Sequence, residues 1–235
     1  MSEERPSAAE DVLVARRQKL ERLRARGIEP FALRFDRDTT AASLHKQFAD
    51  LPPGRGSGRT VRVAGRLVGL RRHGKLSFGV LRDGTGDAQL FLAEEVLGVE
   101  AYEGLEDLDL GDWVGAEGEV VTTKRGELSV RPTGLVLLSK SLRPLPEKWH
   151  GLKDVEIRFR RRYLDLAANP EVRQRTEAQA RLLAALREHL GARGFLEVET
   201  PVLQSVPGGG LAKPFVTHLD ALDIDLYLRI ALELH

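Results

Sequence analysis

The 235-residue sequence predicts an α+β protein: an N-terminal helix, a barrel of five short strands, and the first elements of a further sheet domain. Three observations predict this order. Apolar residues recur at helical spacing over 7–27, alternate with a period of two over 60–139, and then form a helix followed by strand-like runs. An apolar fraction of 42% and a charged fraction of 30% are typical of a folded globular protein.

The first predicted element is a helix over residues 7–27, within a helical arm assigned to 1–50. Ser7 and Glu10 have the spacing of a capping box, and Gly27 is a common helix end. A partial apolar stripe is formed by Val12, Leu13, Leu20 and Leu23. Since the other faces are mostly arginine, two interpretations stay open: a surface helix laid on the body, or a basic arm on a nucleic-acid backbone.

Residues 51–59, LPPGRGSGR, have the composition of a linker. Only the glycines resemble a phosphate-binding loop, because the Gly-Lys-Ser/Thr ending and the following helix are absent. We therefore reject nucleotide binding there. The period-two pattern starts directly after this segment.

Residues 60–140 predict a small closed barrel. The expected strands are 60–70, the two arms of a hairpin in 71–92, and then 113–123 and 126–139, with a helix and loop over 93–112. Five strands with a helix between the third and the fourth are the layout of an OB-fold. One side of each strand should then be apolar and face the interior.

The hairpin carries the first candidate site. If Leu81 and Leu90 face the core, alternation places Phe78 and Gln89 on the outer face. By the same parity Glu127 also faces outward. OB-folds bind oligonucleotides on the outer face of strands two and three. Basic residues stand close by in the sequence: Arg71, Arg72 and Lys75.

Those three side-chain types suit the recognition of a base. An exposed ring stacks on single-stranded bases, and an amide can both donate and accept a hydrogen bond. A carboxylate only accepts, so Glu127 would favour uracil, whose N3 carries a proton, over cytosine. The alternative is that these are surface residues that happen to share a side.

Composition excludes several other functions. There is no cysteine, so disulfide and thiolate chemistry are excluded, and the six histidines lack ligand spacing for zinc. No apolar run approaches the roughly 20 residues of a membrane span, and the acidic N-terminus is not a secretory signal. We expect a cytoplasmic protein. The net charge is only +1, and arginine clusters within 16–26, 55–72 and 158–162 are individually most often solvated faces.

The last third begins with a connector over 141–168, whose first part contains two prolines and no periodicity. Asn169 and Pro170 then predict the start of a helix in the region 169–235. The expected buried face of that helix consists of Leu182, Leu183, Leu186 and Leu190. LEVETPVL, which meets Pro201, and DIDLYLRIALELH predict two strands.

Several ordered segments resemble class II lysyl-tRNA synthetases, from about Val61 to the end of the chain. They include RRHGKLSF, LRDGTGDAQLFL, RPLPEKWHGLKD followed by RRRYLDL, and RGFLEVETPVLQ. The connector over 143–166 resembles the lysine enzyme more than its aspartate and asparagine relatives, which share the anticodon barrel. The resemblance implies that Phe78 stacks on the central anticodon uridine of tRNA-Lys, that Gln89 and Glu127 contact its edge, and that Arg71 holds the base or its phosphate.

Enzymes of this class activate an amino acid with ATP and Mg²⁺ and pass it to the 3′ end of tRNA. The resemblance places the first of three motifs in the helix from Pro170 to Arg193 with GFLEVETPVL, where the family forms its homodimer. The second and third motifs, which bind ATP and magnesium, are expected beyond His235, so no catalytic residue is assigned. We expect binding of tRNA and little or no ligase activity by this chain alone.

Parts of the L-lysine pocket are implied at Gly209, which would approach the substrate backbone, and at Glu233, which would meet the α-ammonium group. This region departs from the family pattern at Gly210, Lys213, Leu219, Asp220, Leu232 and His235. A gene fragment, a truncated paralogue and a corrupted sequence all explain the departures. A stand-alone tRNA-binding or regulatory paralogue, which would dimerise through motif 1 with a complete synthetase, is therefore the alternative function. Because only the first strands of a sheet are present, we expect a stable barrel beside a poorly stable C-terminal third.

Overall fold

The computed structural model describes residues 8–145 and 152–232, and the chain divides into two compact units. We call Met1–Ala168 the barrel unit and Asn169–His235 the second unit, and describe each by itself. The segment 146–151 of the predicted connector lies outside the described residues.

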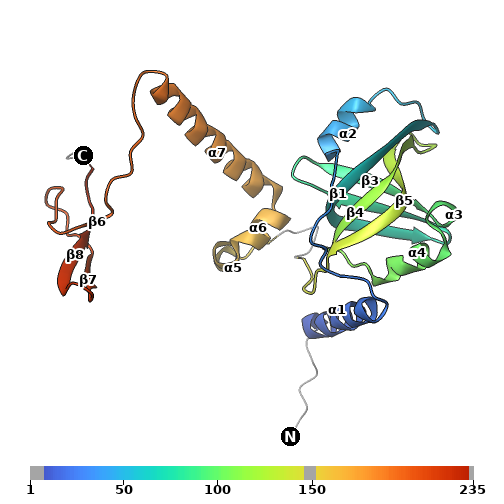
Figure 1. The fold of residues 1–235 in the computed structure, drawn as a ribbon, viewed down its shortest axis with the longest axis horizontal. Coiled ribbons are helices and arrows are strands. Elements are labelled where there is room, and N and C mark those ends of the chain that lie inside the picture. Colours follow the sequence, from blue (N-terminus) through green and yellow to red (C-terminus); the bar gives the residue numbers. More distant parts are fainter. Residues whose placement is uncertain (1–7, 146–151, 233–235) are drawn as a thin grey trace, which may run out of the picture. The chain divides into compact units, whose positions relative to one another are not determined.

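Five strands form the closed barrel of the barrel unit (Figure 1). They are β1 (Gly56–His73), β2 (Leu76–Arg82), β3 (Asp87–Ala93), β4 (Trp113–Thr122) and β5 (Leu128–Ser139). Neighbours follow the order β1-β2-β3-β5-β4, β4 also pairs with β1, and a short parallel pairing joins β3 to β5. The predicted five-stranded barrel is confirmed.

The barrel interior is filled by the apolar side of the alternating strands. Leu81 on β2 and Leu90 on β3 are buried, as their parity predicts, and Val130 on β5 is completely buried. Side chains from all five strands join one hydrophobic cluster with Leu44, Leu97 and Leu105 from the connecting helices. Closure of the sheet therefore gives the unit a core made from its own residues.

One local expectation for the barrel unit was wrong. Residues 56–59, assigned to a linker, belong to β1, where the Gly58 N–H donates to a Glu119 carboxylate oxygen at 3.0 Å. A short helix, α2 (Ala41–Gln47), was not predicted. Thr40 caps it by accepting the Ser43 N–H, and its Leu44 reaches the core.

The connection between β3 and β4 is helical, as predicted. It consists of α3 (Glu94–Leu97), α4 (Val99–Glu103) and the 3-10 helix η1 (Gly104–Asp107). The Tyr102 hydroxyl lies 2.7 Å from the Ser77 hydroxyl and donates to the Gly74 carbonyl at 2.8 Å. This connection is therefore tied to the turn between β1 and β2.

Helix α1 (Ala8–Ala25) is followed by Gly27, whose φ of 72° suits glycine and stops the helix. The Ile28 N–H donates to the Leu23 carbonyl and the Gly27 N–H to the Arg24 carbonyl, the two bonds of a Schellman motif. The predicted N-terminal cap residue, Ser7, lies outside the described residues.

The basic side chains of α1 mostly turn toward the barrel. Arg16 donates to the carbonyls of Leu110 and Ser141, and Lys19 pairs with Asp109 at 2.8 Å. Two arginines pair with Asp107: Arg22 and Arg26. We call these contacts of Arg16, Lys19, Arg22 and Arg26 with the barrel the clamp of α1. These contacts favour the interpretation of a surface helix laid on the body over that of a free basic arm.

A buried ion cluster adjoins this clamp, because Lys19 and Lys140 both pair with Asp109. The Lys140 side chain is completely buried and donates to the carboxylates of Asp109 and Asp112 and to the Asp107 carbonyl. Asp112 is also completely buried and accepts the Ser141 N–H at 2.7 Å. The segment after β5 is thereby fixed to the connection before β4.

Two short helices, α5 (Val155–Arg160) and α6 (Arg162–Ala168), follow in the part of the connector that is described. Arg158 and Arg162 both pair with Asp165, which is completely buried. Arg160 pairs with Glu156 within α5. Most of this arginine cluster is therefore matched by nearby carboxylates.

The second unit contains α7 (Pro170–Gly191) and a three-stranded sheet with the order β6-β8-β7. Its strands are β6 (Leu203–Gln204), β7 (Val216–Leu219) and β8 (Ile224–Leu228). Of the strand predicted over LEVETPVL (196–203), only Leu203 lies in β6, which pairs with β8, and β7 was not predicted.

The predicted buried face of α7 is wrong. The four leucines expected there are all exposed: Leu182, Leu183, Leu186 and Leu190. Spacing showed that the helix is amphipathic, but burial requires a surface that covers the apolar side, and the described residues do not provide one.

Candidate nucleic-acid interface

The outer face of the barrel carries an aromatic row across three strands. The register places Arg71 on β1 opposite Phe78 on β2, and Phe78 opposite Phe91 on β3. The two rings meet edge to face, with centroids 5.4 Å apart and an angle of 78° between their planes. Phe78 is half-buried, so its ring is supported by Phe91 and remains accessible.

The next row along the strands carries the amide. Gln89 on β3 lies opposite Val80 on β2 and, across the parallel pairing, opposite Ser129 on β5. The Gln89 Nε2 group donates to Ser129 Oγ at 2.9 Å. Gly69 on β1, opposite Val80, adds no side chain to this row.

Glu127 lies in the turn between β4 and β5, directly before β5 begins. Its side chain is exposed, while its backbone is held by Thr123: the Thr123 N–H donates to the Glu127 carbonyl, and the Glu127 N–H to Thr123 Oγ1. The Glu127 carbonyl also accepts the Ser129 hydroxyl at 3.3 Å. A chain of hydrogen bonds therefore links Gln89 to Glu127 through Ser129.

The three basic residues near the hairpin are not equivalent. Arg71 shares the face of Phe78, and its exposed side chain has no ion-pair or hydrogen-bond partner among the described residues. Arg72 pairs with Glu106, and Lys75 with Glu94 at 2.9 Å. The hydrogen bond to Glu94 raises the pKa of Lys75. Only Arg71 of the three thus has both the right face and an unmatched charge.

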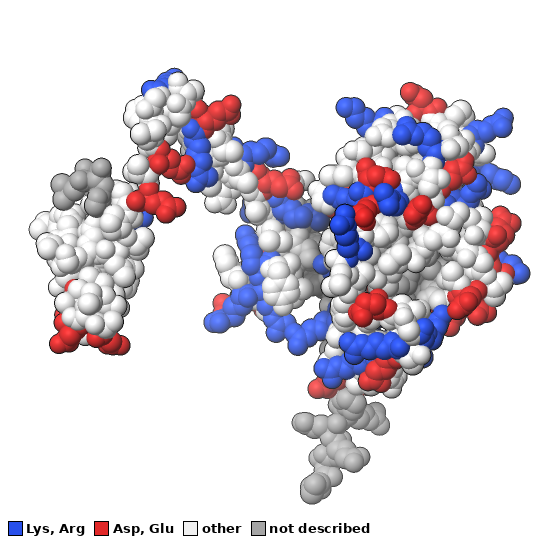
Figure 2. Space-filling model, in the orientation of Figure 1, with Lys and Arg blue, Asp and Glu red and all other residues white. Residues whose placement is uncertain are grey.

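On the face seen in Figure 2, the basic and acidic side chains of the barrel unit are interspersed rather than gathered in one basic patch. This agrees with the small net charge of +1. A nucleic acid would therefore be recognised by local groups, not by the overall field of the molecule.

Sequence reasoning missed the support of the site, Phe91 and Ser129. The sequence does contain the information needed to pair Phe78 with Phe91. The turn from Asp83 to Gly86 pairs Arg82 with Asp87, and four residues further along each strand the same register pairs Phe78 with Phe91. The partner of Gln89 required knowledge that β3 and β5 lie side by side, which no local pattern contains.

The turn between β2 and β3 is fixed by Asp83. Its carboxylate accepts N–H groups from Ala41, at the start of α2, and from Thr85 and Gly86 in the turn. Burial raises the pKa of this carboxyl, but the hydrogen bonds lower it more, so the pKa lies below its ordinary value.

The residues expected in a lysine pocket lie in the second unit. Gly209 has a φ of 110°, and a Cβ there would lie 2.8 Å from the Ala231 Cβ and 3.0 Å from the Ile230 Cβ. Both its backbone angle and its neighbours therefore require glycine. Glu233, the other expected residue, lies outside the described residues.

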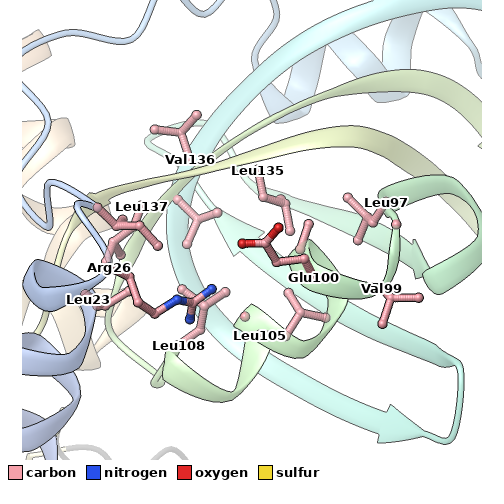
Figure 3. Close-up of a pocket in the computed structure, with 15 residues that line it drawn as sticks. Leu23, Arg26, Leu97, Val99, Glu100, Leu105, Leu108, Leu135, Val136 and Leu137 are labelled. Carbon is pink, nitrogen blue, oxygen red and sulfur yellow. The ribbon is translucent and has the colours of Figure 1, made fainter.

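A separate apolar pocket of about 460 Å³ lies between the end of α1, the α3–η1 connection and β4–β5 (Figure 3). Its polar side chains, Arg26 and Glu100, are surrounded mainly by leucines and valines. It contains none of the residues assigned to base recognition.

No helix in the described part of the chain is long and apolar enough to cross a membrane.

Comparison with known families agrees with this architecture. Residues 61–138 match the family described as OB-fold nucleic acid binding domain, and residues 154–235 match tRNA synthetases class II (D, K and N). The barrel therefore matches a nucleic-acid-binding domain, and the segment after it matches a tRNA synthetase domain, in the order expected from the sequence. Residues 154–235 are thus similar to the class II tRNA synthetases of the D, K and N group.

Lysine–tRNA ligases are among the similar curated proteins. The chain is 50% identical to the lysine–tRNA ligase of Syntrophomonas wolfei over 220 residues, which cover 94% of this chain and 44% of the relative. The enzyme of Moorella thermoacetica is 50% identical over 228 residues, covering 97% and 46%. That of Pelotomaculum thermopropionicum is 47% identical over 225 residues, covering 96% and 44%. The chain thus spans slightly less than half the length of these relatives.

Proposed function

We propose that this chain is the anticodon-binding part of a lysine–tRNA ligase and binds tRNA-Lys through the outer face of β1, β2 and β3. One observation carries the proposal: the accessible ring of Phe78 shares a face with the charge of Arg71, which has no partner within 8–145 and 152–232, and, one row away, with the amide of Gln89. Similarity to lysine–tRNA ligases over nearly the whole chain supports it.

Each group has a role that follows from its chemistry. Phe78 stacks on the central anticodon uridine, and Phe91 holds the ring from its edge. Gln89 and Glu127 contact the edge of the base, where Glu127 accepts the N3–H of uracil, and Arg71 binds the base or its phosphate. Because a carboxylate cannot donate, cytidine in the same position loses a hydrogen bond that uridine makes.

In the complete ligase, L-lysine, ATP and Mg²⁺ would be the further ligands, and α7 would contribute to a homodimer. The described residues do not fit the metal: within 8–145 and 152–232, no group of three or more His, Asp or Glu side chains could hold an ion. We propose tRNA binding without ligase activity for this chain alone. Its place of action would be the cytoplasm.

The test is binding of an anticodon stem-loop RNA by the 235-residue chain, with uridine or cytidine at the central anticodon position. Loss of a base–aromatic stack is worth about 1–3 kcal/mol, so Phe78→Ala should weaken binding of the uridine RNA about 5- to 150-fold. Phe215→Ala, which removes an exposed ring in the second unit, is the matched control and should have no effect. Unchanged binding by a folded Phe78→Ala variant would refute the proposal.

The absence of ligase activity is tested separately by lysine-dependent exchange of pyrophosphate into ATP. We expect no exchange by the purified chain. Robust exchange would show that these residues form an active site by themselves and would overturn that half of the proposal. Binding without exchange would also leave the stand-alone paralogue open, and an open reading frame that continues beyond His235 would exclude it.

A further inference from the structure

Ser129 is buried in a position where its parity points outward. It shares the outer face with Gln89, its register partner, yet it has an exposed fraction of 0%. Its hydroxyl lies 2.9 Å from Gln89 Nε2 and 3.3 Å from the Glu127 carbonyl oxygen. The buried hydroxyl therefore contacts the amide of the proposed base reader on one side and the backbone of Glu127 on the other.

The direction of these hydrogen bonds follows from chemistry. A backbone carbonyl can only accept, so the single proton of the Ser129 hydroxyl is donated to Glu127. The hydroxyl oxygen then has only lone pairs to offer to Gln89, and it must accept from the amide nitrogen. The Gln89 NH₂ group is therefore turned toward Ser129, and its Oε1 atom is left for the solvent side.

We propose that Ser129 is a positioning residue that sets the specificity of the anticodon site by fixing the orientation of the Gln89 amide. This inference rests on the proposed function. With Oε1 outward, Gln89 presents a second acceptor beside Glu127 to the N3–H of uridine, whereas the N3 of cytidine has no proton and would face acceptors only. A reversed amide would present NH₂ instead and would donate to the N3 of cytidine.

Burial makes this control effective. An exposed glutamine amide can exchange its two ends at little cost because water satisfies either orientation. Here reversal would cost one of the two hydrogen bonds of the buried hydroxyl, because its single proton could be donated to Oε1 or to the Glu127 carbonyl but not to both.

The test measures the ratio of stem-loop affinities with uridine and with cytidine at the central position. Ser129→Ala should lower this ratio about 5- to 30-fold, the effect of one orienting hydrogen bond at a desolvated site. Ser77→Ala is the matched control, because Ser77 is also fully buried but its hydroxyl contacts Tyr102 in the barrel wall. It should leave the ratio unchanged, and Ser129→Thr, which keeps the hydroxyl, should restore it.

A second background separates orientation from simple structural damage. Gln89→Glu presents an acceptor in either orientation, so Ser129→Ala should have no further effect on the uridine-to-cytidine ratio in that variant. An equal loss of selectivity in both backgrounds would overturn the orientation mechanism. The same comparison remains informative if Ser129→Ala lowers the stability of the barrel, because both backgrounds carry that loss.

The outcomes distinguish this inference from the proposed function. If Phe78→Ala weakens binding while Ser129→Ala leaves the ratio unchanged, the anticodon site stands and the role of Ser129 is refuted. A wild-type chain with no preference for uridine also refutes it. If Phe78→Ala has no effect on RNA binding, the proposed function itself fails.

Discussion

The two units bury their apolar residues to very different degrees. In the barrel unit, β4 pairs with both β1 and β5, and closure leaves Leu90 with an exposed fraction of 1%. In the second unit, β6 pairs with β8 over two residues, and Leu196 has an exposed fraction of 88%. A closed sheet supplies the partner of every strand from within itself, whereas an open sheet depends on whatever covers its faces and edges. Similar apolar residues therefore stabilise one unit and not the other.

Hydrogen exchange tests this contrast with the largest expected effect. Amides of the barrel strands should exchange only through global unfolding, which requires about 5–15 kcal/mol in a typical domain and slows exchange by at least about a thousandfold. Amides of β6, β7 and β8 should exchange by local opening and be far less protected. Measurement on the monomeric 235-residue chain decides the matter, and uniform protection across both units would contradict it.

A matched pair of substitutions probes the same contrast at single residues. Leu90→Ala removes a buried side chain from the barrel core and should lower the free energy of unfolding by about 2–5 kcal/mol. Leu186→Ala makes the same chemical change on α7, where the side chain is 48% exposed, and should change it by no more than about 0.5 kcal/mol.

Urea unfolding monitored by circular dichroism measures both variants. The barrel transition should shift for Leu90→Ala alone. An equally large effect of Leu186→Ala on that transition would mean that α7 contributes to the stability of the barrel, and the two units would then have to be treated as one cooperative structure.

The barrel could be predicted from sequence because its pattern is local and its burial is internal. Alternation in the hairpin correctly separates Leu81 and Leu90 from Phe78 and Gln89, and β2 and β3 then follow from one turn. The same method failed for α7, because an apolar stripe such as Leu182 to Leu190 predicts a face but not the surface that covers it.

Charge was harder to predict than apolarity. The arginines of α1 gave no indication of their partners, since Arg16 contacts Ser141 and Arg22 contacts Asp107, both far along the chain. The support of the candidate site was missed for the same reason: Gln89 and Ser129 meet only when β3 pairs with β5. Residue types can be read from a sequence, but contacts between distant strands require the fold.

The smallest predicted effect concerns the clamp between α1 and the barrel, and it depends on pH. Burial raises the pKa of the Asp109 carboxyl, but hydrogen bonds from Lys140 and Lys19 lower it more, so the pKa lies below the ordinary value. The folded state therefore keeps this carboxylate ionised to a lower pH than the unfolded chain, in which aspartate titrates near about pH 4. Its contribution to stability is complete above that pH and is lost as the pH falls through the lower, folded-state pKa.

Asp109→Asn should accordingly lower the free energy of unfolding by about 1 kcal/mol at pH 7, and the difference from the wild type should shrink as the solution is acidified toward about pH 3. Asp36→Asn, which removes an exposed ion pair with Arg34, is the control and should have little effect at pH 7. A difference between Asp109→Asn and wild type that stays constant from neutral to acid pH would show that the loss comes from altered packing rather than from the ionised carboxylate. The clamp of α1 would then not depend on this charge.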